Sequence, residues 1–186
     1  MEKIKEYRNT IFPVETIKKA IAEFDSLAKT EKTIKYIKHS SFDEENQSDE
    51  ELLSQSISRE MSIKQLDETW NYDSEDEFFG DYRKYVSSVN HSYFRYKRYL
   101  IFHRLEIRSV SRTDSEVCVQ FSLDLDRRSA IERVFDIFEA DVEKSRIPDE
   151  AITKPKVLIG HGRSTLWRDL KDHLHDKHDY DVVAYE

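Results

Sequence analysis

The residues whose types and spacing are best suited to chemistry lie near the carboxyl end of the chain, and they are Gly160, His161, Gly162, Arg163 and Ser164. They follow a short apolar run and precede leucines at helical spacing. A loop between a buried parallel strand and a helix offers glycines for close backbone approach and free helix N–H groups for anions. We therefore interpret this loop as a candidate site for a nucleotide phosphate. A plain tight turn stays the alternative, because the G-x-G-x-x-G spacing is missing.

A group of histidines and aspartates follows this loop and has the composition of a metal cluster. Its members are Asp172, His173, His175, Asp176, His178 and Asp179. Metal ligands on one helical face must lie three or four residues apart, and among the histidines only His175 and His178 do so. We predict no metal site and interpret the segment as the polar end of a helix, with His178 near the negative end of the helix dipole.

Residues 91–99 interleave basic and aromatic side chains, and the stretch from Tyr93 to Tyr99 has the composition on which a single-stranded nucleic acid stacks. Pairing of β-strands explains the same pattern. The net charge of −8 favours strand pairing, because a phosphate backbone attracts an excess of Lys and Arg. Nucleic-acid binding is therefore the less favoured alternative.

The composition predicts a soluble, cytoplasmic protein with no membrane partner. The chain has 186 residues, 38% of them hydrophobic and 37% charged, which is enough for one proper core plus a fragment. Its single cysteine, Cys118, forms no disulfide within the chain and suits a reducing compartment. Cys118 alternates with Val117 and Val119, so we interpret it as a packing residue and not as a nucleophile. Neither a membrane-spanning run of ~20 residues nor a signal-peptide core is found.

The candidate phosphate loop needs a strand before it and a helix after it, and the sequence predicts both. Val157–Ile159, between Pro155 and Gly160, has the pattern of a buried parallel strand. The apolar residues that predict the helix are Leu166, Trp167, Leu170 and Leu174. A second apolar run begins at Val182. Residues 155–186 are therefore predicted to form one strand–loop–helix–strand unit.

This unit resembles the start of the bacterial TIR-like domains described as predicted nucleotide-binding proteins. That family begins with a strand ending in His-Gly-Arg or His-Gly-His, followed by a helix and a second strand ending in Glu. The resemblance lies at His161–Arg163 and Glu186 and covers residues 155–186, roughly a sixth of the chain. It implies a flavodoxin-like α/β domain, contacts from residues 160–164 to NAD or a related nucleotide, and, for some members, NAD cleavage in anti-phage defence.

A complete domain of this kind needs ~100 residues or more. In TIR-like enzymes the catalytic Glu lies on a later helix, so Glu186 does not match it. We therefore expect these 186 residues to belong to a longer parent, and to supply neither a catalytic residue nor a cofactor site of their own. The resemblance implies that the parent binds NAD or cleaves it as a glycohydrolase. One helix cannot cover both faces of a parallel sheet, so we expect the unit to pack against the preceding domain or against a partner chain.

Residues 1–150 are predicted to form a separate α+β domain. We expect this domain to start with a helix, in which apolar residues recur at helical spacing from Val14 to Leu27. Alternation over Thr33–Lys38 predicts a strand. The acidic tract Ser41–Glu51 predicts a mobile loop, and Ile57–Leu66 a half-buried antiparallel strand.

The second half of this domain is predicted to be a helix, a β-meander and another helix. Ser74 and Glu77 have the spacing of a capping box, and the aromatics before them, Trp70 and Tyr72, are expected to staple the helix to a sheet. The meander is expected over residues 91–125. Asp126 or Ser129 opens the last helix, with Ser129 and Glu132 as a second capping box. This order of helices and strands along the chain predicts an antiparallel or mixed sheet that is covered on one face by the two longer helices.

Three hypotheses about function follow from these patterns. The first is a sensing or oligomerising module that regulates a TIR-like nucleotide-binding protein, with a homo-oligomer and an unknown activating signal or partner protein as its partners. The second is a nonenzymatic scaffold. The third is a nucleic-acid-binding module that works through Tyr93–Tyr99.

Overall fold

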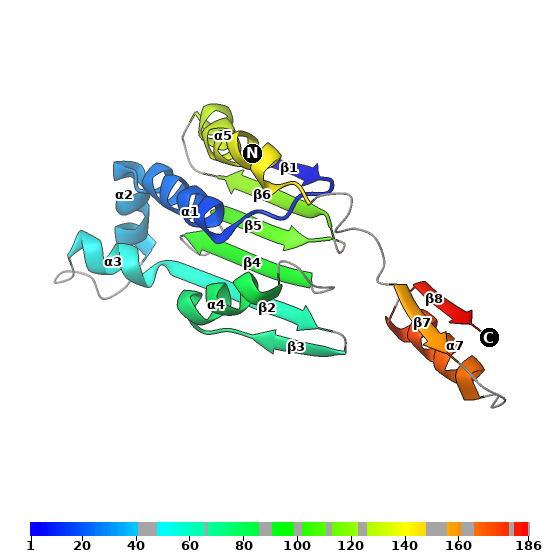
Figure 1. Ribbon diagram of the computed structural model, residues 1–186. Helices are drawn as coiled ribbons and strands as arrows, with labels where there is room; N and C mark the ends of the chain where they lie inside the picture. The colour runs from blue at the N-terminus through cyan, green and yellow to red at the C-terminus, as the bar shows by residue number, and fades with distance from the viewer. Residues whose placement is uncertain are drawn as a thin grey trace. The chain divides into compact units, whose positions relative to one another are not determined.

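In the computed structural model, the described residues are 1–40, 48–65, 67–85, 91–98, 102–110, 113–122, 126–147, 156–160, 166–178 and 181–185. The chain divides into two compact units, Met1–Ile147 and Pro148–Glu186. The larger unit contains an antiparallel sheet with helices, and the smaller one contains a parallel strand pair with one helix (Figure 1). The chain is therefore of the mixed α+β class, as predicted.

Six antiparallel strands form the sheet of the larger unit. They are β1 (Glu2–Tyr7), β2 (Ile57–Gln65), β3 (Glu68–Asn71), β4 (His91–Arg98), β5 (His103–Ser109) and β6 (Ser115–Phe121). Their order across the sheet is β1-β6-β5-β4-β2-β3, so β1 and β3 are the two edges. The predicted meander is confirmed in β4, β5 and β6, which are consecutive neighbours.

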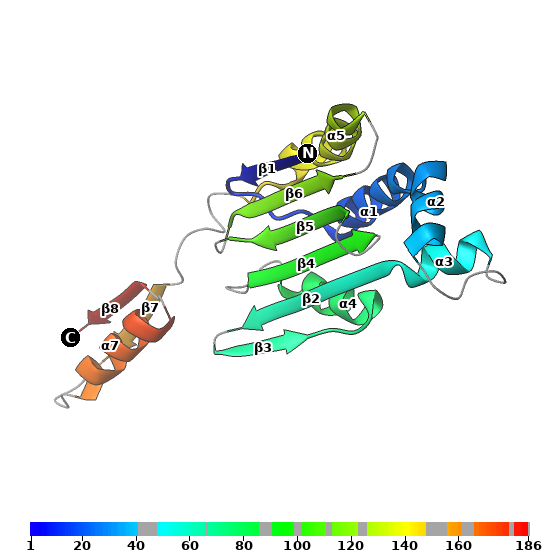
Figure 2. The ribbon, with the colours of Figure 1, turned by 180° about the vertical axis from the view of Figure 1, so that it is seen from behind.

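Helices cover one face of this sheet, as predicted. The helices of the larger unit are α1 (Val14–Ala28), α2 (Glu31–Ser40), α3 (Asp49–Gln55), α4 (Glu75–Tyr85) and α5 (Arg127–Ser145). Of these, α1, α4 and α5 lie over the same face, whereas the view from behind shows the bare strands (Figures 1 and 2). An antiparallel sheet can keep one face in water, because alternate side chains of each strand point to opposite faces.

The hydrophobic core lies between the sheet and these helices. Its largest fully buried side chains include Phe12, Phe24, Phe78, Phe94, Phe121, Phe135 and Phe138. The rings of Phe24 on α1 and Phe121 on β6 stack with their centroids 4.9 Å apart. Burying a side chain of this size stabilises the fold by roughly 1.5–3 kcal/mol. The aromatic residues therefore bind the helical layer to the sheet.

The first element is the strand β1, so the prediction that this domain starts with a helix is wrong, whereas the helix predicted from Val14 to Leu27 is confirmed as α1. In β1 every second residue faces the covered side of the sheet, but Lys3 and Lys5 stand where apolar residues are usual. Lys3 Nζ forms an ion pair with Glu132 of α5 at 2.6 Å, and Lys5 Nζ pairs with Glu139 of the same helix. Because these ion pairs replace apolar contacts, the strand has no hydrophobic alternation to reveal it.

The predicted strand over Thr33–Lys38 is wrong, because these residues belong to α2. The Thr33 N–H donates to the Thr30 hydroxyl at 3.3 Å, at the start of this helix. Thr33 is buried and Ile37, four residues on, packs against the core. Six alternating residues fit this i, i+4 face as well as they fit a strand.

The predicted loop over Ser41–Glu51 is wrong at its end, where Asp49–Glu51 form the first turn of α3. Ser48 and Glu51 make a complete capping box, with bonds of 3.3 and 3.1 Å. Acidic residues suit the positive end of a helix dipole, so acidic composition did not exclude a helix. Residues 41–47 lie outside the described part of the chain.

The cap of α4 is confirmed, and of the two caps predicted for α5 the structure shows Asp126. The Glu77 N–H donates to the Ser74 hydroxyl at 3.2 Å. In α5 the Ser129 N–H donates to the Asp126 carboxylate at 3.3 Å, so Asp126 is the cap. Ser129 lies within the helix, and the capping box predicted for Ser129 and Glu132 is wrong.

The smaller unit contains β7 (Lys156–Gly160), α7 (Leu166–His178) and β8 (Asp181–Tyr185). The two strands pair in parallel, with Val157 beside Val182. The predicted strand–helix–strand order is confirmed. Within the residues that the structure describes, no helix has both the length and the apolar character to cross a membrane.

Candidate functional site

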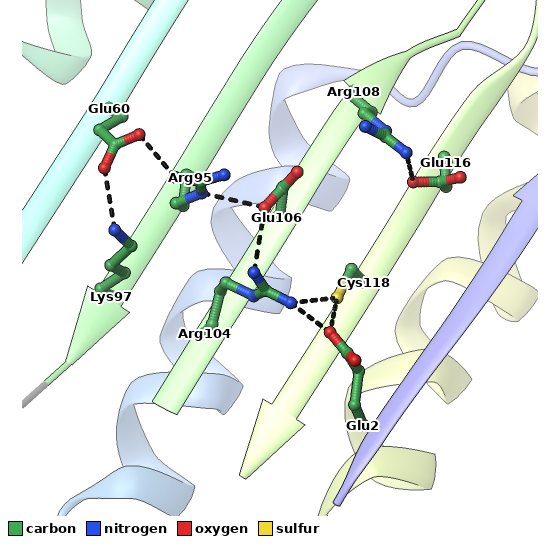
Figure 3. A network of polar contacts seen from close by, with 9 residues as sticks. All are labelled: Glu2, Glu60, Arg95, Lys97, Arg104, Glu106, Arg108, Glu116 and Cys118. Carbon is green, nitrogen blue, oxygen red and sulfur yellow. Dashed lines mark hydrogen bonds and ion pairs between the residues drawn. The ribbon is translucent and has the colours of Figure 1, made fainter. Parts of the chain in front are cut away.

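The face of the larger sheet that the helices leave uncovered carries a network of polar side chains (Figure 3). Its members are Glu2, Glu60, Arg95, Lys97, Arg104, Glu106, Arg108, Glu116 and Cys118. They come from β1, β2, β4, β5 and β6, and the strand register places them on one face. We call this surface the charged face.

One half of the charged face is organised around Arg95 of β4. Its Nε donates to Glu106 on β5 at 2.9 Å, and its Nη1 donates to Glu60 on β2 at 2.7 Å. Lys97 Nζ donates to the second oxygen of Glu60 at 2.9 Å. Arg95 therefore links two carboxylates across three neighbouring strands.

The other half is organised around Arg104 of β5. Its guanidinium pairs with Glu2 on β1 and lies 3.9 Å from Glu106. The Cys118 thiol donates to Glu2 at 3.1 Å, and Arg104 Nη2 lies 3.5 Å from the sulfur. Farther along the strands, Arg108 pairs with Glu116 at 2.5 Å. Four acidic and four basic side chains thus balance each other on this face.

These contacts move several pKa values away from neutrality. The hydrogen bond from Cys118 lowers the pKa of Glu2, and the one from Lys97 lowers that of Glu60. Burial, together with the neighbouring Glu2, raises the pKa of Cys118 to about 12. Burial and the charge of Glu106 raise the pKa of Tyr93 to about 12. Both carboxylates are ionised and the thiol is protonated at pH 7, which suits recognition better than acid–base or nucleophilic catalysis.

The basic and aromatic residues of β4 are divided between two faces. Tyr93, Arg95 and Lys97 lie on the charged face, where the Arg95 guanidinium lies 5.1 Å from the centre of the Tyr93 ring. Phe94, Tyr96 and Arg98 are buried on the covered side. The hydroxyl of Tyr96 donates to Asp25 of α1 at 2.9 Å, and Arg98 pairs with the same carboxylate. Arg98 also donates to the carbonyl of Leu53 at 2.6 Å.

Because β4 divides between two faces, its side chains do not form one stacking platform. Its cations already have carboxylate partners, which leaves less charge for a phosphate backbone. Tyr99, the last residue of the proposed nucleic-acid site, lies outside the described residues.

Only one of the five residues predicted to contact a nucleotide is placed by the structure. Gly160 ends β7, at the carboxyl edge of the parallel pair, where ligands of open α/β sheets bind. A Cβ atom added to Gly160 would meet nothing within 4 Å, so packing does not require a glycine there. His161, Gly162, Arg163 and Ser164 lie outside the described residues.

The charged face was not predicted as a site, although its signal is visible in the sequence. Arg104, Glu106 and Arg108 alternate with buried Leu105 and Ile107, and such alternation marks a strand with one wet face. What the alternation cannot show is which strands are neighbours. The partners Glu2 and Glu60 lie far from Arg104 and Arg95 in the chain and meet them only through the order of the strands.

A scan against protein-family models finds no match to this chain, and neither the search of curated proteins nor that of solved structures finds a match.

Proposed function

We propose that this chain is the sensing or oligomerising module of a bacterial TIR-like nucleotide-binding protein, together with the first strand–helix–strand of the nucleotide-binding domain. In this proposal residues 1–150 regulate and residues 155–186 begin the effector domain. The observation that supports it best is the parallel β7–α7–β8 unit, in which Gly160 ends the first strand and the His-Gly-Arg sequence follows directly.

The proposed ligand of the effector domain is NAD or a related nucleotide. Gly162 permits close backbone approach, and Arg163 provides charge-assisted hydrogen bonds to a phosphate. The free N–H groups at the start of the following helix favour the same anion. Cleavage of NAD in anti-phage defence, in the cytoplasm, is the activity proposed for the parent and not for these 186 residues.

The charged face supports the regulatory half of the proposal. A protein partner that covers this face meets cations and carboxylates that already hold each other in place, so less side-chain freedom is lost on binding. The alternating charges also reject partners with the wrong pattern, since like charges brought together cost several kcal/mol. A surface of this kind is suited to selecting one protein signal.

A nonenzymatic scaffold is the second candidate, because the charged face serves assembly equally well without any nucleotide. A calorimetric titration with NAD separates the two candidates. It is performed on a protein in which residues 155–186 continue into a complete domain. A saturable heat of NAD binding supports the nucleotide-binding proposal. If the folded protein gives no heat of binding, the nonenzymatic scaffold becomes the better-supported function.

A further inference from the structure

The two edge strands of the larger sheet differ in how they are protected against pairing with another chain. Edge strands expose N–H and C=O groups that can pair with another strand, and proteins block this with charges, proline or a cover. No described strand pairs with the outer edge of β1 or of β3. All four residues of β3, Glu68–Asn71, are exposed, and Trp70 at its centre is 57% exposed. The sequence of β3 contains neither lysine nor proline.

The backbone of β3 presents a defined set of hydrogen-bonding groups to solvent. The Tyr72 N–H donates to the Met61 carbonyl at 2.9 Å, and the register pairs Trp70 with Ile63. Hydrogen-bonded pairs alternate along an antiparallel ladder, so Trp70 bonds inward to β2. Thr69 and Asn71 therefore direct their N–H and C=O groups outward.

We propose that β3 is a dimerisation edge, at which β3 of a second copy of this chain adds in antiparallel register around Trp70. The outward groups are self-complementary in this register, because Thr69 of each copy exchanges two hydrogen bonds with Asn71 of the other. Trp70 then stands opposite Trp70 of the second copy in a non-hydrogen-bonded pair, where cross-strand side chains are closest. The proposal rests on the oligomerising role proposed above and names the partner.

A second copy fits β3 better than it fits β1. Met1 and Phe121 exchange backbone hydrogen bonds on the side of β1 that faces β6. Because inward and outward residues alternate along the strand, the N–H and C=O groups that point outward from β1 are those of Glu2, Ile4 and Glu6. Self-pairing around Ile4 would place Glu2 opposite Glu6 and Lys3 opposite Lys5. Like charges directly opposite are destabilising. In β3 the paired residues Thr69, Trp70 and Asn71 carry no charge.

The test uses sedimentation velocity on the full 186-residue chain over a range of concentrations. The wild-type chain is expected to dimerise reversibly. Thr69→Pro removes an N–H that points outward and leaves the bonds to β2 in place, a position at which an edge strand tolerates proline. Two hydrogen bonds are lost per dimer, so the dissociation constant should rise roughly thirtyfold or more. Trp70→Ser should also weaken the dimer and provides the second variant if Thr69→Pro does not fold.

Ile4→Pro is the matched control, since Ile4 is 55% exposed and its N–H points outward on the other edge. It should leave the dimer unchanged. Because Trp70 and Trp167 are the two tryptophans, Trp167→Phe makes Trp70 the sole reporter, and its emission should shift to shorter wavelength on dimerisation.

Three results would overturn the proposal: a wild-type chain that stays monomeric, a folded Thr69→Pro variant that dimerises with wild-type affinity, or a dimer that is lost with Ile4→Pro. None of these results bears on NAD binding, so the failure of this inference is distinguishable from the failure of the proposed function.

Discussion

His103 is a histidine within the hydrophobic core, fully buried on β5 with its ring 5.2 Å from that of Phe121. Burial lowers its pKa from 6.5 to about 4, because a charged imidazole loses its hydration inside the core. The unfolded chain therefore binds this proton more readily than the folded chain does between pH 6.5 and 4. Folding stability must fall as the pH falls through this window.

We predict that His103 is responsible for a loss of up to roughly 3 kcal/mol in the free energy of unfolding between pH 7 and 4. His103→Phe removes the titrating group and keeps a ring of similar shape. The variant should lose less stability over this range than the wild type does. Urea unfolding at a series of pH values measures the difference. His91→Phe, at an exposed end of β4, is the control for exchanging a histidine for a phenylalanine outside the core. Parallel pH profiles for the wild type and His103→Phe would contradict this prediction.

Residue patterns in the sequence predicted which residues are buried better than they predicted which polar side chains contact each other. The meander predicted over residues 91–125 has alternating apolar residues, and Leu105, Ile107 and Phe121 among them are buried in the core. Cys118 alternates with the buried Val117 and Val119, and it contacts Glu2 on the charged face. By contrast, the pair between Asp25 and Arg98 joins residues that only the packing of α1 against β4 brings together. Charge complementarity alone cannot select such a pair among the many charged residues of this chain.

Helices and strands were predicted correctly where one hydrophobic periodicity dominated. The prediction failed where a helical and a strand periodicity fitted the residues equally well. The helix face of α1 and the alternation of β6 each had a single explanation. The residues of α2 fit both a strand and a helix, and the packing of Ile37 and the buried Thr33 decides between them. The strand β3 is four exposed residues long, so neither burial nor period reveals it. Trp70, expected to staple a helix to the sheet, is exposed there instead.

The Asp126 cap of α5 gives a prediction at the scale of the element. Asp126→Ala should lower the free energy of unfolding by about 1 kcal/mol, because the Ser129 N–H loses its acceptor. Ser129→Ala should cost clearly less, since Ser129 is inside the helix. Ser48→Ala is the matched control for a capping residue and should resemble Asp126→Ala. Chemical denaturation of the three variants measures these costs. If Ser129→Ala proves the more damaging change, Ser129 is the cap after all.

At the scale of the whole molecule, the apolar faces of the helices and of the sheet in the larger unit cover each other. Among the described residues, the core formed by α1, α4, α5 and the strands β1, β2, β4, β5 and β6 lies within Met1–Ile147. The sequence supported this only in outline, because the predicted order of elements lacked β1 and β3. The nucleotide-binding role rests on a resemblance over residues 155–186 and stays a prediction.

We predict that a chain ending at Ile147 folds by itself. Its thermal unfolding should be cooperative, with a melting temperature close to that of the larger unit in the full chain. Circular dichroism and calorimetry of the shortened and full chains provide the comparison. A broad, non-cooperative transition would show that residues after Ile147 belong to the same folding unit, and would contradict the predicted domain limits of 1–150 and 155–186.

The most direct test of the proposed function is NAD binding by a protein that continues residues 155–186 into a complete domain. Calorimetric titrations compare the wild type with Arg163→Ala, Gly162→Val and the control Lys171→Ala on α7. Arg163→Ala loses a charged hydrogen bond worth ~1.5–3 kcal/mol, so its affinity for NAD should be roughly ten- to a hundredfold lower than that of the wild type. Gly162→Val should weaken binding at least as much by steric exclusion. The control should bind as the wild type does, and all variants should melt alike. Unchanged affinity in both loop variants would show that residues 160–164 are only a turn, and the scaffold would then be the better account.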